Sequence, residues 1–378
     1  MRRNIVSILF LLCACALISS PVATAATVTL TKLASFGGGD GWLAPGEGGY
    51  TFLGTGNNER GLTYGNGHVY LVSRTGGTNV RILNSTTGAD LGGLNVTGVS
   101  GGTFAISAAG VGADGTIYAA NLTTQSTTTP FTVYKWTSEA AAPSVAYAGD
   151  GGLAGSRLGD DFAVTGSGSS TRFAAGYNST PIVAGNNSYS IIDPAASTAT
   201  AIAFTGTPPN AGDFRLGLTF VDATHVLGTA GSSLYRNTSY SGSAGTLINS
   251  PAIPDPSGAT ADRLLAYTTF GGSTLLAVQS IGDSHVTIYD ASNPAAPVYL
   301  ASGNNTSGSL TTNGNATGQI AWGDITNNAD GSVSRTLYAM STNQGIQAFV
   351  VTVPEPATLS MIGLLVAACG LMARRRVS

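Results

Sequence analysis

Short apolar runs rich in Val, Ile, Tyr and Thr recur along the middle of the chain, separated by Gly, Asn, Asp and Pro. Apolar and polar positions alternate within these runs, which is typical of half-buried β-strands and not of helices. We therefore predict strands at residues 68–73, 79–83, 116–120, 132–136, 189–192, 225–228, 264–267, 274–278, 286–289, 336–340 and 347–351. Tight turns are predicted at Asp114-Gly115 and Asp330-Gly331, because glycine accepts the positive φ that hairpins require.

A looser unit of two apolar strands, a turn and an outgoing strand recurs about every 40 to 50 residues, a period typical of β-propeller blades. The paired segments are 69–72 with 81–83, 117–120 with 133–136, and 275–278 with 287–290. The repeat predicts an all-β, β-propeller-like domain of about six or seven blades. A pair of β-sandwiches and a right-handed β-helix are the alternatives, although a β-helix would repeat about every 20 residues. Residues 27–36 are expected to supply a strand that closes the last blade.

The N-terminus has the three parts of a secretory signal peptide. Arg2 and Arg3 form a charged start, residues 5–18 are apolar, and Ala23 and Ala25 occupy the small-residue positions of an A-x-A cleavage site. We expect cleavage after Ala25, so that residues 1–25 direct export through the Sec translocon and are removed by signal peptidase.

Three features follow one another at the C-terminus: a Pro-Glu-Pro motif, an apolar run and an arginine cluster. They consist of Pro354, Glu355 and Pro356, then residues 359–372, then Arg374, Arg375 and Arg376. The two prolines keep their segment extended and exposed. The apolar run falls short of the roughly 20 residues of a spanning helix, but flanking residues and snorkelling arginines extend it. The positive-inside rule then places the arginines in the cytoplasm and the rest of the chain outside.

Together these features resemble the PEP-CTERM signal of exported bacterial proteins that an exosortase processes. The resemblance covers residues 353–378 and implies an exosortase partner, an inner-membrane-anchored precursor and a Gram-negative host that produces polysaccharide. The final location would be the cell surface or the extracellular matrix. A permanent C-terminal anchor without processing is the alternative. The predicted organisation is a signal peptide at 1–25, an extracellular β-propeller-like domain at 26–352 and a sorting signal with a transmembrane helix at 353–378.

The three cysteines, Cys13, Cys15 and Cys369, all lie in the terminal segments. The mature domain therefore has no disulfide, no cysteine nucleophile and no cysteine metal site, and a core of this size needs no disulfide. Lipidation at Cys15 is disfavoured, because Cys13 stands where lipoprotein signals usually carry a small or aliphatic residue.

Charge places limits on the partners of the mature domain. Five of the 16 basic and one of the 19 acidic residues lie in the terminal signals, which leaves 11 and 18 and a net charge of −7. This balance argues against nucleic acid and anionic lipid as partners. A surface built largely from hydroxyls and amides suits an extracellular polysaccharide environment.

Three histidines each precede a valine, at His68, His225 and His285. Histidine is a common metal ligand, and a shared position at strand starts could gather the three on one face of a ring. No carboxylate recurs at a ligand spacing beside all three, so each is expected simply to open a strand. No cofactor or metal site is predicted.

Acidic residues beside arginines are the other candidates for chemistry. These are Asp160 and Asp161 after Arg157, Asp213 beside Arg215, and Asp262 beside Arg263. Such groups could hold Ca²⁺ or act as acid and base, but their recurrence suggests structural ion pairs. Residues 327–331 could bind a structural Ca²⁺ loosely, yet they lack the spacing and closing Glu of a calcium loop and predict a hairpin turn. Ser100, between glycines, lacks the following helix of a nucleophile elbow.

These observations predict no catalytic residue. The first functional hypothesis is an exported envelope or matrix protein with a structural, adhesive or ligand-binding role, its partners including exosortase and extracellular polysaccharide. The alternative is a polysaccharide lyase or glycosidase on a propeller. Two carboxyls roughly 5 to 10 Å apart in a deep pocket would favour the enzyme. A channel lined with Ser, Thr and Gly would favour the binding role.

Overall fold

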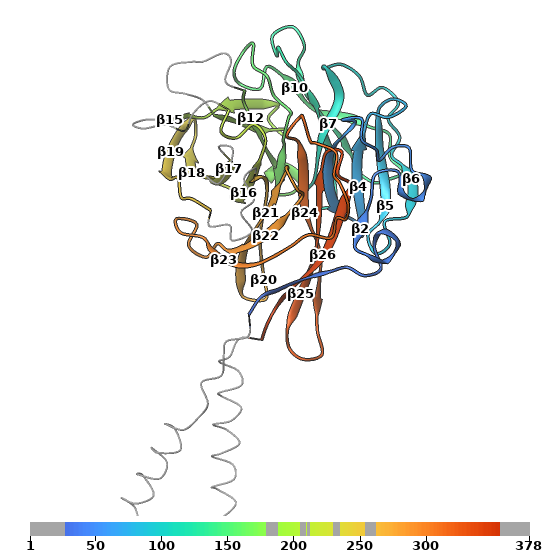
Figure 1. Ribbon diagram of the computed structural model, residues 1–378. Coiled ribbons are helices and arrows are strands. Elements are labelled where there is room, and N and C mark those ends of the chain that lie inside the picture. The colour runs from blue at the N-terminus through green and yellow to red at the C-terminus, as the bar shows by residue number, and fades with distance from the viewer. Residues whose placement is uncertain are drawn as a thin grey trace, which may run out of the picture. The chain divides into compact units, whose positions relative to one another are not determined.

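A computed structural model describes residues 27–178, 188–204, 209, 212–229, 235–253 and 262–355 (Figure 1). Its strands form six antiparallel sheets, which are the blades of a β-propeller. Blade 1 contains β3 (Glu59–Gly65), β4 (His68–Ser73), β5 (Asn79–Asn84) and β6 (Asp90–Gly93). Blade 2 contains β7 (Phe104–Val111), β8 (Ile117–Leu122), β9 (Phe131–Trp136) and β10 (Ser144–Gly149). Blade 3 contains β11 (Ala163–Thr165), β12 (Arg172–Gly176), β13 (Tyr189–Asp193) and β14 (Thr198–Ala201).

Blade 4 contains β16 (Leu218–Asp222), β17 (His225–Thr229), β18 (Tyr235–Ser241) and β19 (Ala244–Asn249), with the short β15 (Ala203–Phe204) parallel to β19. Blade 5 contains β20 (Asp262–Phe270), β21 (Ser273–Ser280), β22 (Val286–Asp290) and β23 (Val298–Gly303). Blade 6 contains β24 (Gly318–Asn327), β25 (Val333–Ser341), β26 (Ile346–Val353), β1 (Thr29–Lys32) and β2 (Trp42–Leu43). Three short 3₁₀ helices lie in loops: η1 (Gly37–Gly39), η2 (Glu47–Gly49) and η3 (Gly168–Ser170). The fold is thus a six-bladed propeller, which confirms the predicted class.

The first strands of the blades contact one another in the order β3, β7, β11, β16, β20 and β24, and β24 returns to β3. These six strands therefore surround a central channel. The strand β1, from the N-terminal end of the domain, pairs antiparallel with β26, so that Leu30 lies opposite Val351. The ends of the domain thus share one blade, which confirms the expected closing strand and leaves the ring without an open junction.

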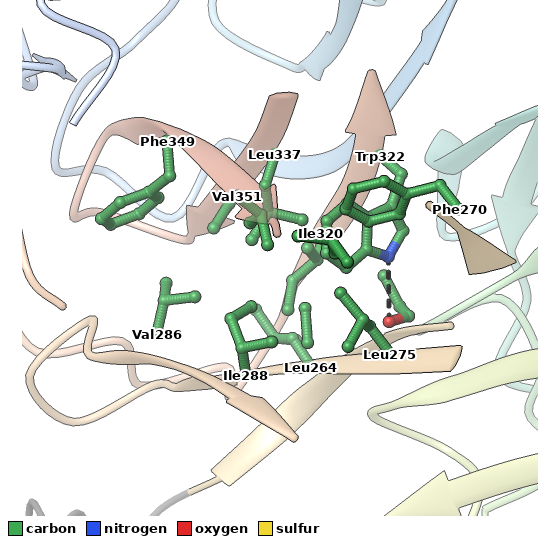
Figure 2. Packing of buried hydrophobic residues seen from close by; sticks show 14 of the residues in the cluster. Leu264, Phe270, Leu275, Val286, Ile288, Ile320, Trp322, Leu337, Phe349 and Val351 are labelled. Carbon is green, nitrogen blue, oxygen red and sulfur yellow. Dashed lines mark hydrogen bonds between the residues drawn. The ribbon is translucent and has the colours of Figure 1, made fainter. Parts of the chain in front are cut away.

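The core lies between neighbouring blades. Figure 2 shows the junction of blades 5 and 6, where Ile288 of β22 and Leu264 of β20 face Val351 of β26 across a dry interface. The Trp322 indole closes this junction with a hydrogen bond of 3.1 Å from Nε1 to the carbonyl of Ala266. Equivalent clusters fill the other junctions. Burial of apolar side chains between twisted sheets therefore stabilises the whole ring.

The predicted strands were found, and all but one of them are second or third strands of blades. The exception is the segment 264–267, which lies in the first strand β20. The turns at Asp114-Gly115 and Asp330-Gly331 join first to second strands, and both glycines have φ above 80°. The other first strands were missed: β3, β7 and β24 contain several Gly or Ala residues, and β11 is only three residues long.

The terminal signals lie largely outside the described residues. Ala23, Ala25, Pro356, the apolar run 359–372 and the arginines 374–376 all fall there, and Pro354 and Glu355 are the last described positions. In the part of the chain that the structure describes, no helix has the length and apolar character needed to cross a bilayer.

Candidate functional site

The first strands of all six blades begin at the same end of the channel, which we call the channel mouth. Charged side chains gather there from segments that are distant in sequence. Arg60 lies at the start of β3, Arg263 at the start of β20, and Arg215 just before β16. Arg157 and Asp160 lie in the loop before β11. The mouth is therefore assembled from equivalent positions of four different blades.

Asp160 is the hub of this group. Its carboxylate accepts bonds from Arg60 at 3.0 Å, from Arg157 at 2.6 and 2.7 Å, and from Arg215 at 2.7 Å. The exposed fraction is only 1% for Asp160 and 2% for Arg60, whereas Arg157 and Arg215 each keep 27%. Burial alone would raise the pKa of Asp160, but its bonds and attraction to Arg157 and Arg215 outweigh that effect and lower it. Asp160 is therefore a fixed anion.

Gly159 sets the position of the hub. It adopts φ of +93°, and a Cβ there would lie 1.9 Å from the carbonyl oxygen of Asn121. Only glycine fits both this left-handed backbone and this close approach. The local sequence Gly-Asp therefore lets the loop from blade 2 pass against β8 and turn Asp160 into the mouth.

Positive charge at the mouth exceeds what Asp160 can neutralise. Burial lowers the pKa of Arg60 to about 10, with Asp160 opposing the shift and the neighbouring arginines adding to it. Burial also lowers the pKa of Arg263, and the charge of Arg215 lowers it further. The buried Nε of Arg263 has no hydrogen-bond acceptor among the described residues. The mouth is thus locally cationic on an acidic domain.

A second group of charged side chains, Glu59 and Arg74, extends the mouth over blade 1. The guanidinium of Arg74 lies 3.6 Å from the centre of the Phe104 ring and donates to the carbonyl of Asn57 at 2.6 Å. Burial raises the pKa of Glu59, against the attraction of Arg74. Arg60 lies over the same Phe104 ring at 5.2 Å. Phe104 therefore holds two arginines at the rim by cation–π contact.

Asp161 and Gln319 tie the inner strands together just inside the mouth. Asp161 accepts the backbone N–H groups of Phe162 and Leu218, both at 2.8 Å, and Gln319 Nε2 at 3.2 Å. Gln319 Oε1 accepts N–H groups from Leu62 and from β7. Burial raises the pKa of Asp161 to about 7, although these bonds oppose the shift. The two side chains link five of the six first strands and form a polar layer across the channel.

Two cavities occupy the channel beyond this layer. One cavity has a volume of about 320 Å³ and is lined mainly by the first strands of the blades. Its lining includes Asp161, Gln319, Tyr64 and Arg335. The second, about 430 Å³, lies between β11, β16 and β20 and includes Asp222. Each lining contains a single carboxylate among its residues, and most of the exposed wall of each cavity is polar. Threonines contribute to both linings and glycines to the first, whereas no serine lines either, so the Ser, Thr and Gly lining that would favour a binding role is partly present.

The histidines do not gather. His68 contacts Glu139 at 2.6 Å and His225 contacts Asp222 at 2.8 Å, each at the start of a second strand. His285 precedes the third strand β22 in blade 5. No group of three or more His, Cys, Asp and Glu side chains suited to a metal occurs within the described ranges.

Two other expectations have clear outcomes. Residues 327–331 form the hairpin between β24 and β25, with Gly331 donating to the Asn328 carbonyl at 3.1 Å. The expected pairing of Asp213 with Arg215 is wrong: Arg215 binds Asp160, and Asp213 binds Arg236 at 2.7 Å. Residues 212–215 form a turn, with the Arg215 N–H donating to the Gly212 carbonyl at 3.1 Å, and each of the two side chains pairs with a residue outside that turn. The side chain of Asp262 lies outside the described residues, so its pairing with Arg263 stays a prediction.

Sequence reasoning missed Arg60, Arg74 and Gln319. A signal for the mouth was present, because an acid and an arginine stand together at or just before the start of the first strands of four blades. These pairs are Glu59 with Arg60, Arg157 with Asp160, Asp213 with Arg215, and Asp262 with Arg263. The four acid–arginine pairs were visible in the sequence. Without the blade boundaries, however, they could not be recognised as occupying the same position in four blades.

The fold and the mouth define an all-β, six-bladed propeller protein with a charged channel entrance. Residues 352–376 match the PEP-CTERM protein-sorting motif. The chain therefore carries a PEP-CTERM sorting motif after a propeller domain, which confirms the resemblance seen in its sequence. The motif implies an exported, membrane-anchored precursor that an exosortase processes at the cell envelope.

Solved structures support the fold. A DUF4623 family protein from Bacteroides eggerthii is similar at 18% identity and a TM-score of 0.61, covering 89% of this chain and 77% of that one. The Mala s 1 allergen of Malassezia sympodialis is similar at 11% identity and a TM-score of 0.46, covering 77% of this chain and 92% of that one. The first likeness shows the fold alone, and the second is too distant to add to it. A search of curated protein sequences found no match.

Proposed function

We propose that this chain is an exported envelope or matrix protein whose propeller binds extracellular polysaccharide without catalysis. The observation that carries the proposal is the sorting motif at residues 352–376, which directs a domain with no cysteine and an amide- and hydroxyl-rich surface out of the cell. In this proposal residues 1–25 are a cleaved signal peptide, and residues 353–378 anchor the precursor in the inner membrane of a Gram-negative cell. The mature domain then resides at the surface or in the matrix.

The mouth and channel support binding over hydrolysis. Glycoside hydrolysis uses two carboxyl groups about 5 to 10 Å apart, one of them free to donate a proton. Asp160 is held as an anion by three arginines. Asp161 has a pKa raised by burial to about 7, which suits a general acid, yet both its oxygens accept N–H bonds from the strands. Asp160 and Asp161 are thus committed to holding the fold.

Sorting is tested by cell fractionation and C-terminal mass mapping of the wild type beside a Glu355→Ala variant. We expect the wild type to lose its arginine tip and the variant to keep it and remain in the inner membrane. A Glu47→Ala variant, changed at a described acid far from the tail in sequence, should be processed like the wild type. Identical C-termini in wild type and Glu355→Ala would contradict processing at this motif.

Binding is tested with the processed protein recovered from the producing cells and a panel of immobilised polysaccharides. We expect retention on at least one polysaccharide with no shortening of the chains, measured by size-exclusion chromatography. Release of shorter oligosaccharides would instead establish the enzyme alternative.

A further inference from the structure

We propose that the channel mouth is a binding site for an oxyanion, and that its natural source is the carboxylate of an acidic saccharide. Arg157, Arg215 and Arg263 are the residues that would contact it. The assignment of a saccharide rests on the function proposed above, whereas the oxyanion site itself rests on the geometry of the mouth.

The first argument is an excess of positive charge. Arg60, Arg157 and Arg215 share the single carboxylate of Asp160, so the group carries two uncompensated positive charges before Arg263 is counted. Like charges held at short range in a partly dry site repel one another strongly. A bound anion would relieve this repulsion, which gives the site an intrinsic preference for negative ligands.

The second argument is the supply of unused donors. A guanidinium has five N–H groups arranged as a planar fork that matches carboxylate, sulfate and phosphate oxygens. Arg157 uses two of its nitrogens on Asp160, and Arg215 uses one on Asp160 and one on Asn178. Both side chains are 27% exposed, so a ligand in solution can reach their remaining donors. Arg263 adds a buried Nε without an acceptor in the described part of the chain.

The third argument is preorganisation. Asp160 holds three of the arginines in place, and Gly159 fixes Asp160 by its close approach to β8. Gly217 packs its Cα against the backbone of Arg263, where a Cβ would lie 1.6 Å from the Arg263 carbonyl oxygen. Arginines that are already ordered lose little conformational freedom when they bind, which favours affinity.

The net charge of −7 on the mature domain limits how such a ligand is attracted. Charges are screened beyond about 8 to 10 Å at physiological ionic strength, so a bound anion experiences the nearby arginines more than the distant acids. The domain as a whole would still slow the approach of a long polyanion. We therefore expect recognition of a single acidic residue at a chain end or branch, with an affinity that falls as salt is added.

The experiment is calorimetric titration of the processed protein with three probes at low salt. They are an oligogalacturonate, a neutral galactose oligosaccharide of the same length, and inorganic sulfate. We expect the acidic oligosaccharide to bind at least about tenfold more tightly than the neutral one, since each charge-assisted hydrogen bond contributes about 1.5–3 kcal/mol. Raising the salt concentration should weaken its binding, while any binding of the neutral sugar stays unchanged.

Variants locate the site. Arg215→Gln and Arg263→Gln should each weaken oligogalacturonate binding by about tenfold or more. The matched control is Arg172→Gln, because Arg172 is paired one to one with Asp193 at 2.9 Å and lies at the start of a second strand, away from the mouth. It should leave affinity within about twofold. Circular dichroism and thermal melting establish that each variant is folded. If Arg215→Gln does not fold, Arg263→Gln alone tests the site.

The outcomes separate the two proposals. Equal binding of acidic and neutral sugars, unaffected by Arg215→Gln and Arg263→Gln, would overturn the oxyanion site while the polysaccharide-binding function stands. Binding of sulfate that Arg215→Gln abolishes, without binding of any saccharide in either assay, would support the oxyanion site and overturn the saccharide as its source. No binding of oligogalacturonate or sulfate would overturn the site altogether.

Discussion

Arg60 and Asp160 stand 100 residues apart in the chain and form a salt bridge of 3.0 Å in which both side chains are almost fully buried. The pair joins β3 of blade 1 to the loop before β11 of blade 3, across the width of blade 2. Arg157 and Arg215 complete the group at the same carboxylate. One aspartate therefore links blades 1, 3 and 4 at the channel mouth, where the proposed ligand would bind.

Removing the charge of this hub is expected to destabilise the protein strongly. Asp160→Asn leaves three guanidiniums without their shared anion, and breaking a buried ion pair in this way costs about 3–5 kcal/mol. The measurement is the free energy of unfolding from urea denaturation. Asp193→Asn is the control, because its pair with Arg172 is partly exposed and is expected to contribute about 0–1 kcal/mol. Equal losses in the two variants would contradict the role of Asp160 as a hub.

The buried Asp161 is expected to make stability depend on pH. Its folded pKa of about 7 lies above the unfolded value of about 3.9, so between these values the folded state holds a proton that the unfolded state releases. Stability should therefore decline as pH rises from about 4 to about 7, by at most about 1.4 kcal/mol per pH unit from this group.

Asp161→Asn should flatten that decline, measured as the difference in unfolding free energy between the two proteins at several pH values. Asp160, whose pKa is lowered in the folded state, does not affect this difference, because both proteins contain it. A difference that stays constant from pH 4 to pH 7 would show that Asp161 titrates normally.

Gly159 is expected to tolerate no side chain. Gly159→Ala places a Cβ 1.9 Å from the carbonyl of Asn121 and forces alanine into a left-handed backbone, which alone costs about 1–3 kcal/mol. Gly98→Ala is the matched control, since Gly98 also has positive φ but no atom within 4 Å of the added Cβ. Thermal melting should show a larger loss for Gly159→Ala, and equal losses would mean that the close approach relaxes freely.

Phe36 is expected to anchor the segment that follows the closing strand β1. Its side chain is fully buried, packs against Tyr338 of β25 at 5.9 Å between ring centres, and covers Gly88 in the β5–β6 loop. Phe36→Ala should cost about 3–5 kcal/mol in urea denaturation, because it leaves a cavity at the junction of blades 6 and 1. Val145→Ala on the exposed edge strand β10 should change stability by less than about 0.5 kcal/mol.

Much of the fold could be predicted because second and third strands are flanked by other strands and bury most of their side chains, which makes them short apolar runs. Leu71 and Ile82 belong to such strands, although β4 is buried continuously from Val69 to Ser73 and not at alternate positions as predicted. The first strands were harder to detect, because they converge on the channel and require small residues. At Gly61 of β3, a Cβ would lie 2.8 Å from the Cα of Ala108 in β7. The first strands lie so close together that they need small residues at the contacts. They therefore show less of the apolar–polar alternation from which strands are predicted.

The chain by itself determined the features that depend on local order. Alternation within short runs predicted the strands, and the repeat of about 40 to 50 residues predicted the blades. The Pro-Glu-Pro motif, its apolar run and the arginines predicted the sorting signal. The number of blades and the assembly of the channel mouth were decided only by the tertiary structure. Arg60, Asp160 and Arg215 meet because each stands at or just before the start of the first strand of a different blade, and closure of the ring brings these positions into contact.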